Sequence, residues 1–110
     1  MSKTVSYQDF SKLKIVVARV LEVTPIEKAD RLLKVKLDAG EEYGQRTVIA
    51  GIKKWYEPEE LIGRQVVYFA NLEPRELYGV VSQGMILAAD DKGACLLQPD
   101  KEVTNGSKVL

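Results

Sequence analysis

Short apolar stretches separated by turn residues follow one another along most of the chain. In residues 33–38 apolar residues alternate with polar ones, among them Lys34 and Lys36. Side chains of a strand point alternately to its two faces, so this pattern predicts a half-buried strand with its lysines facing solvent. Residues 14–23 are β-branched and apolar on both faces. That pattern predicts a strand shared between two sheets of a small barrel, or one lying at a subunit interface.

The remaining segments predict shorter strands, two short helices and the turns between them. We expect further strands at residues 45–50, 65–70, 85–89 and 94–98. Short helices are expected at 6–13 and 57–63. A hairpin loop is expected at 39–44 and a tight turn at 90–93. The second helix has Pro58 at its first position, glutamates in its first turn and Gly63 after its end. Each of these is favoured at that place in a helix.

Three strands, a short helix and two strands are the element order of the oligonucleotide/oligosaccharide-binding (OB) barrel. We therefore predict an all-β protein, a five-stranded OB-fold Greek-key barrel with a short helix between strands 3 and 4 and with N- and C-terminal extensions. A single domain would occupy residues 1–110, with a core from about residue 12 to 98. Residues 99–110 would form a C-terminal extension that offers a dimer contact.

The segment 71–84, which lies between two predicted strands, is longer than a simple connection. Segments of this length without secondary structure are uncommon inside a compact domain and are usually functional or disordered. Leu77, Val80 and Val81 make the segment too apolar for a solvated linker. It is therefore predicted to be a packed recognition loop. Its polar side chains are those of Asn71, Arg75, Ser82 and Gln83.

Charge is balanced over the whole chain but not locally. Sixteen Lys and Arg residues face 16 Asp and Glu residues, so the chain is not a polycation that would coat nucleic acid. The most basic window is 28–36, which is either a solvated face or a phosphate-binding surface. Its cationic residues are Lys28, Arg31, Lys34 and Lys36, and Arg46 and Lys53 follow on and after the next strand.

Composition argues against several kinds of active site. The chain has no His and a single Cys, Cys95, which excludes Ser-His and Cys-His nucleophiles, a histidine zinc site and a disulfide within the chain. The densest carboxylates lie in a predicted turn and a helix start with no base beside them, so we expect no enzyme activity, metal or cofactor. No apolar run is long enough to span a membrane and no signal-peptide core is present, so we expect a cytoplasmic protein.

Residues 71–85, Asn-Leu-Glu-Pro-Arg-Glu-Leu-Tyr-Gly-Val-Val-Ser-Gln-Gly-Met, carry a longer motif. It closely resembles the Asn-Leu-x-Pro-x-x-(Leu/Met)-x-Gly-x-x-Ser-x-Gly-Met signature of the tRNA-binding domain family. Residues 9–15, 29–32 and 50–52 also resemble family positions, so the resemblance runs from about residue 9 to the end. The family's OB module occurs at the C-terminus of bacterial methionyl-tRNA synthetases and in free-standing structure-specific tRNA-binding proteins.

The resemblance implies a non-catalytic protein that binds folded tRNA as a homodimer, with no membrane association. It would assist methionyl-tRNA synthetase as a domain or as a separate subunit. The alternative is a peptide-binding, chaperone-like member of the same fold family. Glu73, Glu76 and Tyr78 depart from the family, whose members often carry Lys or Arg there. The expected RNA-binding residues are Lys28, Arg31, Lys34, Lys36, Arg46, Lys53, Asn71, Arg75, Ser82, Gln83 and Met85.

Within that set, the residue types imply different contacts. Lys and Arg would meet phosphates and set the register, because phosphate contacts position a protein on RNA. Asn71, Ser82 and Gln83 would hydrogen-bond sugar or backbone groups. Met85 would shape the base of the loop or touch an exposed base.

Overall fold

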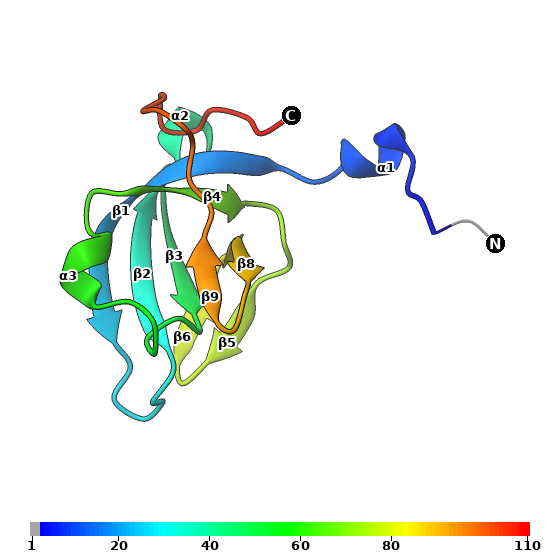
Figure 1. Cartoon of the computed structure of the whole chain (residues 1–110). Helices are drawn as coiled ribbons and strands as arrows, with labels where there is room; N and C mark the ends of the chain where they lie inside the picture. The colour runs from blue at the N-terminus through cyan, green and yellow to red at the C-terminus, as the bar shows by residue number, and fades with distance from the viewer. Residues whose placement is uncertain (1–2) are drawn as a thin grey trace.

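Five strands of one antiparallel sheet wrap around the core in the order β3-β2-β1-β4-β7 (Figure 1). The computed structural model describes residues 3–110. The strands are β1 (Ile15–Pro25), β2 (Leu33–Asp38), β3 (Gln45–Ala50), β4 (Gln65–Phe69) and β7 (Met85–Ile86). After the meander β1-β2-β3, the chain returns to place β4 beside β1, which is a Greek-key arrangement. The predicted all-β, five-stranded barrel is confirmed.

The core lies where the apolar pattern placed it. Leu33, Val35 and Leu37 of β2 have no exposed surface, whereas the lysines between them face outward. Along β1, the consecutive residues 16–18 are all buried, as expected of a strand with two apolar faces. An irregularity in the pairing between Val20 and Glu22 lets β1 bend around the barrel.

Short helices join the strands. The helix α1 (Tyr7–Phe10) begins where the Ser6 hydroxyl accepts a hydrogen bond from the Asp9 backbone, and α3 (Pro58–Leu61) lies between β3 and β4 with Leu61 buried. A third helix, α2 (Gly40–Tyr43), occupies the predicted hairpin loop. This helix lies close to the C-terminal segment, since a Cβ on Gly40 would lie 2.7 Å from the Cα of Gly106.

Two expectations about the chain after β4 are wrong. The predicted loop 71–84 contains a hairpin, β5 (Arg75–Leu77) and β6 (Val80–Ser82). The predicted strand 85–89 is divided, because β7 pairs with β4 and the chain then enters β8 (Ala88–Asp90). The strand β8 pairs instead with β9 (Ala94–Leu96) in a separate two-stranded sheet.

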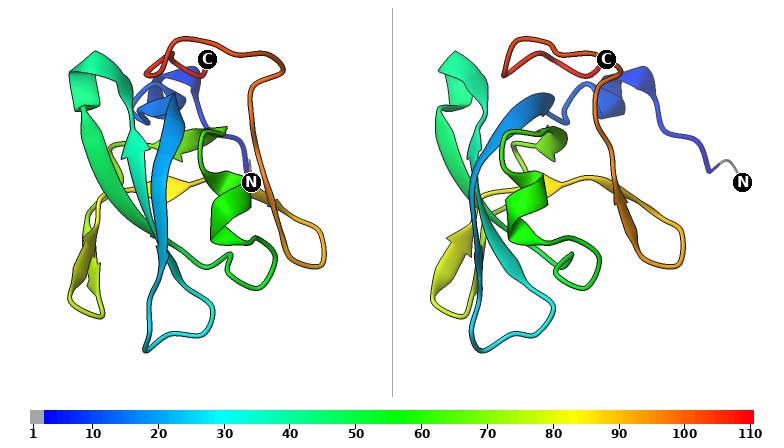
Figure 2. Two further views of the ribbon diagram at one scale, coloured as in Figure 1. Left: turned by 90° about the vertical axis from the view of Figure 1, so that its left-hand side faces the viewer. Right: turned by 60° about the vertical axis from the view of Figure 1, so that its left-hand side comes forward.

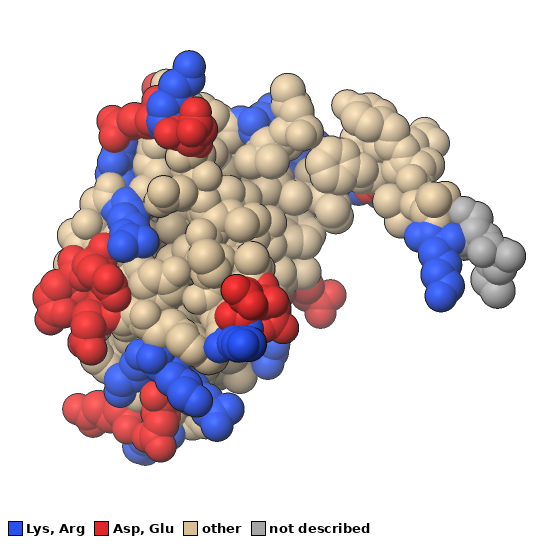
Figure 3. Space-filling model, viewed as in Figure 1, with Lys and Arg blue, Asp and Glu red and all other residues tan. Residues whose placement is uncertain are grey.

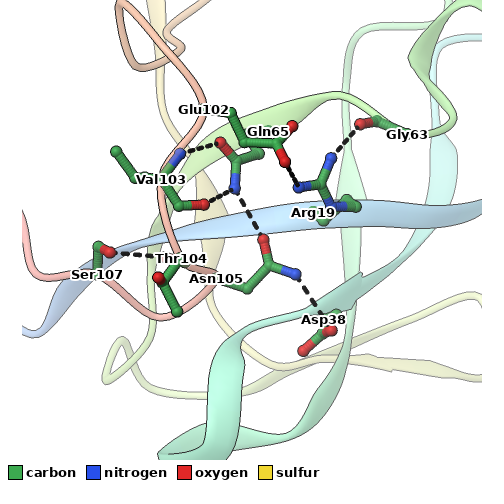
Figure 4. A network of polar contacts seen from close by, with 9 residues as sticks. All are labelled: Arg19, Asp38, Gly63, Gln65, Glu102, Val103, Thr104, Asn105 and Ser107. Atoms are coloured by element: carbon green, nitrogen blue, oxygen red, sulfur yellow. Dashed lines mark hydrogen bonds and ion pairs between the residues drawn. The ribbon is translucent and has the colours of Figure 1, made fainter.

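The C-terminal extension is fixed to the barrel through Gln65 (Figure 4). The Gln65 amide nitrogen donates to the Val103 carbonyl at 2.6 Å and to Asn105 Oδ1 at 2.9 Å. Gln65 Oε1 accepts from the Val103 N–H at 3.1 Å, and Asn105 Nδ2 donates to Asp38 Oδ2 at 3.2 Å. Gln65 is buried, so these bonds also satisfy polar atoms that water does not reach.

The N-terminal segment stands apart from the barrel, at the end to which the C-terminal segment also returns (Figures 1 and 2). The helix α1 buries none of its residues within the chain. None of the helices in residues 3–110 is long and apolar enough to cross a membrane.

Candidate nucleic-acid interface

Four exposed basic residues lie on the β1–β2 loop, on β2 and on the segment after β3. Lys28 and Arg31 stand on the β1–β2 loop, and Lys34 faces outward from β2. Lys53 joins them from the segment after β3, since its backbone N–H donates to the Arg31 carbonyl at 3.2 Å. All of these side chains are exposed. We call these four residues the basic surface.

The cationic groups of the basic surface are not neutralised within the chain. Across residues 3–110, no ion pair or side-chain hydrogen bond engages Lys28, Arg31, Lys34 or Lys53. Lys36 differs, because its Nζ lies 3.9 Å from Glu22 Oε1. The end of the barrel that carries the β1–β2 loop shows Lys and Arg side chains gathered with acidic ones among them (Figure 3). The attraction of this end of the barrel for phosphate therefore comes from individual cations.

The β5–β6 hairpin is joined to the edge of β3 by two of the predicted RNA-binding residues. Ser82 Oγ accepts from the Ile49 N–H at 2.9 Å and donates to the Gly84 carbonyl at 3.2 Å. Gln83 Oε1 accepts from the Thr47 N–H at 2.9 Å, and the Gln83 N–H donates to the Thr47 carbonyl at 2.8 Å. These side chains, which we expected to bond RNA sugar or backbone groups, hold the hairpin against β3 in this structure. Ser82 is only 7% exposed.

Asn71, predicted to contact RNA, also has its partners inside the chain. Its Oδ1 accepts from the Lys14 N–H at 2.7 Å, and its Nδ2 donates to the Lys12 carbonyl at 2.7 Å. Asn71 therefore ties the end of β4 to the segment that leads into β1.

Arg46, which we also predicted to meet phosphate, is turned toward the barrel. Its Nε donates to the Tyr43 carbonyl at 3.2 Å, and its Nη1 lies 3.3 Å from both the Tyr68 hydroxyl and the Ala70 carbonyl. The guanidinium carbon stands 5.3 Å from the centre of the Tyr43 ring. The Tyr68 hydroxyl donates to the Gln83 carbonyl, and burial raises the pKa of Tyr68. Arg46 thus connects β3 with α2 and β4, and Tyr68 extends this network to Gln83 after the hairpin.

Arg75, Tyr78 and Met85 are exposed on and beside the hairpin. Arg75 is exposed on β5 and, within the described residues, has no ion pair. Met85 is 42% exposed at the start of β7, and Tyr78 is 58% exposed at the hairpin tip. Sequence reasoning noted Tyr78 only as a departure from a family motif. The dipeptide Tyr78-Gly79 gave only a weak signal for a two-residue turn, because such turns prefer Asn-Gly or Asp-Gly.

No metal-binding cluster is found in the part of the chain that the structure describes. Groups of three or more His, Cys, Asp or Glu side chains placed to hold an ion are absent from residues 3–110. Asp90 ends β8 and Asp91 lies in the turn before β9. What the site presents is an open cationic surface beside an exposed hairpin, a combination suited to binding a polyanion.

Proteins of known sequence match nearly the whole chain. A family model described as a putative tRNA binding domain matches residues 15–108. A methionine–tRNA ligase from Pyrococcus abyssi is 53% identical over 106 residues, which are 96% of this chain and 14% of the ligase. The corresponding ligase of Parabacteroides distasonis is 47% identical over 109 residues, or 97% of this chain and 16% of the ligase. The chain thus spans a small part of these relatives.

Two solved structures share the fold over nearly the full length of both chains. A MetRS-related protein from Pyrococcus horikoshii has a TM-score of 0.90 and 31% identity, and covers 99% of this chain and 100% of its own. The chaperone CsaA from Bacillus anthracis has a TM-score of 0.89 and 29% identity, with 97% and 99% covered. The resemblance seen in the motif at 71–85 is confirmed, and the chain belongs to the tRNA-binding domain family.

Proposed function

We propose that this tRNA-binding domain holds tRNA for a methionyl-tRNA synthetase, either as part of the enzyme chain or as a separate subunit. The observation that carries the proposal is the basic surface, whose four cations have no partner among the described residues of a barrel that matches the family. Its benefit to the enzyme is effective concentration, because a second contact keeps the tRNA near the catalytic part. Such a role places the chain in the cytoplasm.

We infer the role of each residue in tRNA binding from the contacts that its side chain makes within the chain. Lys28, Arg31, Lys34 and Lys53, with Arg75 on the hairpin, meet phosphates and fix the register on a folded tRNA. Lys36 adds a weaker contact because Glu22 lies beside it. Met85 supplies apolar surface at the base of the hairpin. The remaining predicted residues position these groups: Arg46, Asn71, Ser82 and Gln83. In this proposal residues 1–110 act as one tRNA-binding domain.

The double variant Arg31→Ala/Lys34→Ala tests the basic surface. Each phosphate contact releases about one counterion, so losing two contacts should lower the slope of log K against log salt by roughly two units. The measurement is tRNA affinity by fluorescence anisotropy over a range of salt. The matched control is Lys3→Ala/Lys101→Ala, which removes the same charge from the N- and C-terminal segments. Equal slopes for the two double variants would show that the basic surface does not face RNA.

A second candidate function is supported by the structural match to the chaperone CsaA. The two functions differ in what stays bound when the protein is purified. Nucleic-acid absorbance that disappears as salt rises indicates tRNA, because phosphate binding is salt-dependent. A polypeptide that is retained at high salt indicates the chaperone function.

We further propose that the chain acts as a homodimer, with the second copy covering the N-terminal helix and the C-terminus. Tyr7 and Leu110 are 79% and 96% exposed, and both line a hollow of about 210 Å³ with Phe10, Tyr43 and Val109. Since α1 buries no residue within its own chain, its apolar side chains need another surface.

Sedimentation at micromolar concentration should give a dimer for the unaltered protein. Tyr7→Ser combined with Leu13→Ser should shift the equilibrium toward monomer, because both exposed apolar side chains would be lost from the contact. Ile62→Ser is the control, since Ile62 is 53% exposed elsewhere on the barrel. A monomer at all concentrations of the unaltered protein would contradict the proposed dimer.

A further inference from the structure

Tyr78 has a backbone conformation that suits its side chain poorly. Leu77 pairs with Val80, so Tyr78 and Gly79 alone form the turn between β5 and β6. Their φ angles are +52° and +79°. A two-residue hairpin turn with both central φ angles positive strongly prefers Asn-Gly or Asp-Gly. A bulky residue in this region is uncommon and strained, and such strain is concentrated at functional sites.

Within the described residues, no specific contact of the Tyr78 side chain favours this conformation. Tyr78 is 58% exposed, so more than half of its surface is free of packing. In residues 3–110 it makes no hydrogen bond, ring contact or cation–π contact. The strained position therefore presents an aromatic ring to solvent.

The ring borders a hollow that reaches the β1–β2 loop. The hollow measures about 400 Å³ and is lined by Ile26, Glu27, Lys28 and Tyr78. These residues offer four different chemical groups at one place. An aromatic ring stacks on bases, an aliphatic side chain excludes water, an ammonium meets phosphate and a carboxylate accepts from base amino groups.

We propose that Tyr78 stacks on an unpaired nucleobase of the bound RNA within this hollow. Glu27 accepts a hydrogen bond from an amino group of the base, and Lys28 meets the phosphate beside it. The inference rests on the proposed tRNA binding and adds a base-level contact to a surface that otherwise meets phosphates. A carboxylate beside the ring selects adenine, cytosine or guanine over uracil, which has no amino group.

Tyr78→Asn separates stacking from folding. Asn-Gly is the preferred sequence for this turn, so the variant should unfold at the same denaturant concentration as the unaltered protein or higher. Losing one stacked base should nonetheless weaken tRNA binding about tenfold, with the salt slope unchanged because no charge is removed. Tyr78→Phe should bind nearly normally. Val81→Asn is the control, since Val81 is 51% exposed on the same hairpin.

The outcomes distinguish this inference from the function on which it rests. If the unaltered protein binds no tRNA, the proposed function and the stacking site both fail. If it binds tRNA and Tyr78→Asn binds equally well, only the stacking site is overturned. Short oligo(A) should compete with tRNA better than oligo(U), and Glu27→Ala should reduce that difference. An unchanged preference in Glu27→Ala would overturn the role of Glu27.

Discussion

Alanine in place of Gly84 is expected to lower the free energy of unfolding by about 4 kcal/mol. Gly84 has a φ of +107°, a conformation that an L side chain rarely adopts. An added Cβ would lie 2.8 Å from Cε1 of Tyr68 and against the Phe69 carbonyl oxygen. Neither can move aside easily, because Tyr68 is fully buried and Phe69 belongs to β4. The substitution would therefore separate the hairpin from the barrel.

Gly79→Ala is the matched control for this experiment. Gly79 also has a positive φ, +79°, but nothing lies within 4 Å of the Cβ it would gain. Only the backbone strain remains, so the expected loss is about 1 kcal/mol. Denaturant unfolding followed by circular dichroism measures both variants. Similar losses for the two would mean that the close approach to Tyr68 is not what requires glycine at residue 84.

The barrel could be predicted because its signals are local. Alternation fixes which face of β2 is buried, and Pro58 with its following glutamates marks α3. The β5–β6 hairpin gave no comparable signal. Each of its strands has three residues, too few for a period to be read, and its turn is Tyr-Gly rather than Asn-Gly.

The partners of the polar side chains within the chain could not be predicted from the sequence, for a physical reason. An amide or hydroxyl side chain bonds an RNA sugar and a distant backbone group with the same atoms. Gln83 accepts a hydrogen bond from Thr47, which is 36 residues away along the chain, and Asn71 accepts one from Lys14, which is 57 residues away. No local pattern reveals such partners. The outward direction of the β2 lysines could be predicted, because a long charged side chain on the polar face of an alternating strand points to solvent.

Arg46→Met is expected to lower the free energy of unfolding by about 3 kcal/mol without changing the salt dependence of tRNA binding. Methionine keeps much of the apolar length but leaves the Tyr43 and Ala70 carbonyls and the Tyr68 hydroxyl without their donor. Unpartnered groups of this kind cost about 1–3 kcal/mol each when buried, and these are only partly buried. The measurements are denaturant unfolding and the salt slope of tRNA affinity.

Lys34→Met removes the same charge from an exposed strand position and should show the reverse result. Its stability should change by less than about 0.5 kcal/mol, because surface substitutions are usually neutral, while the salt slope falls by roughly one unit. Together the two variants distinguish a cation that stabilises the barrel from a cation that binds phosphate. If Arg46→Met lowered the slope as Lys34→Met does, the guanidinium would have to leave Tyr68 and reach phosphate when tRNA binds. The closed arrangement of β3, β4 and the hairpin would then belong to the free protein only.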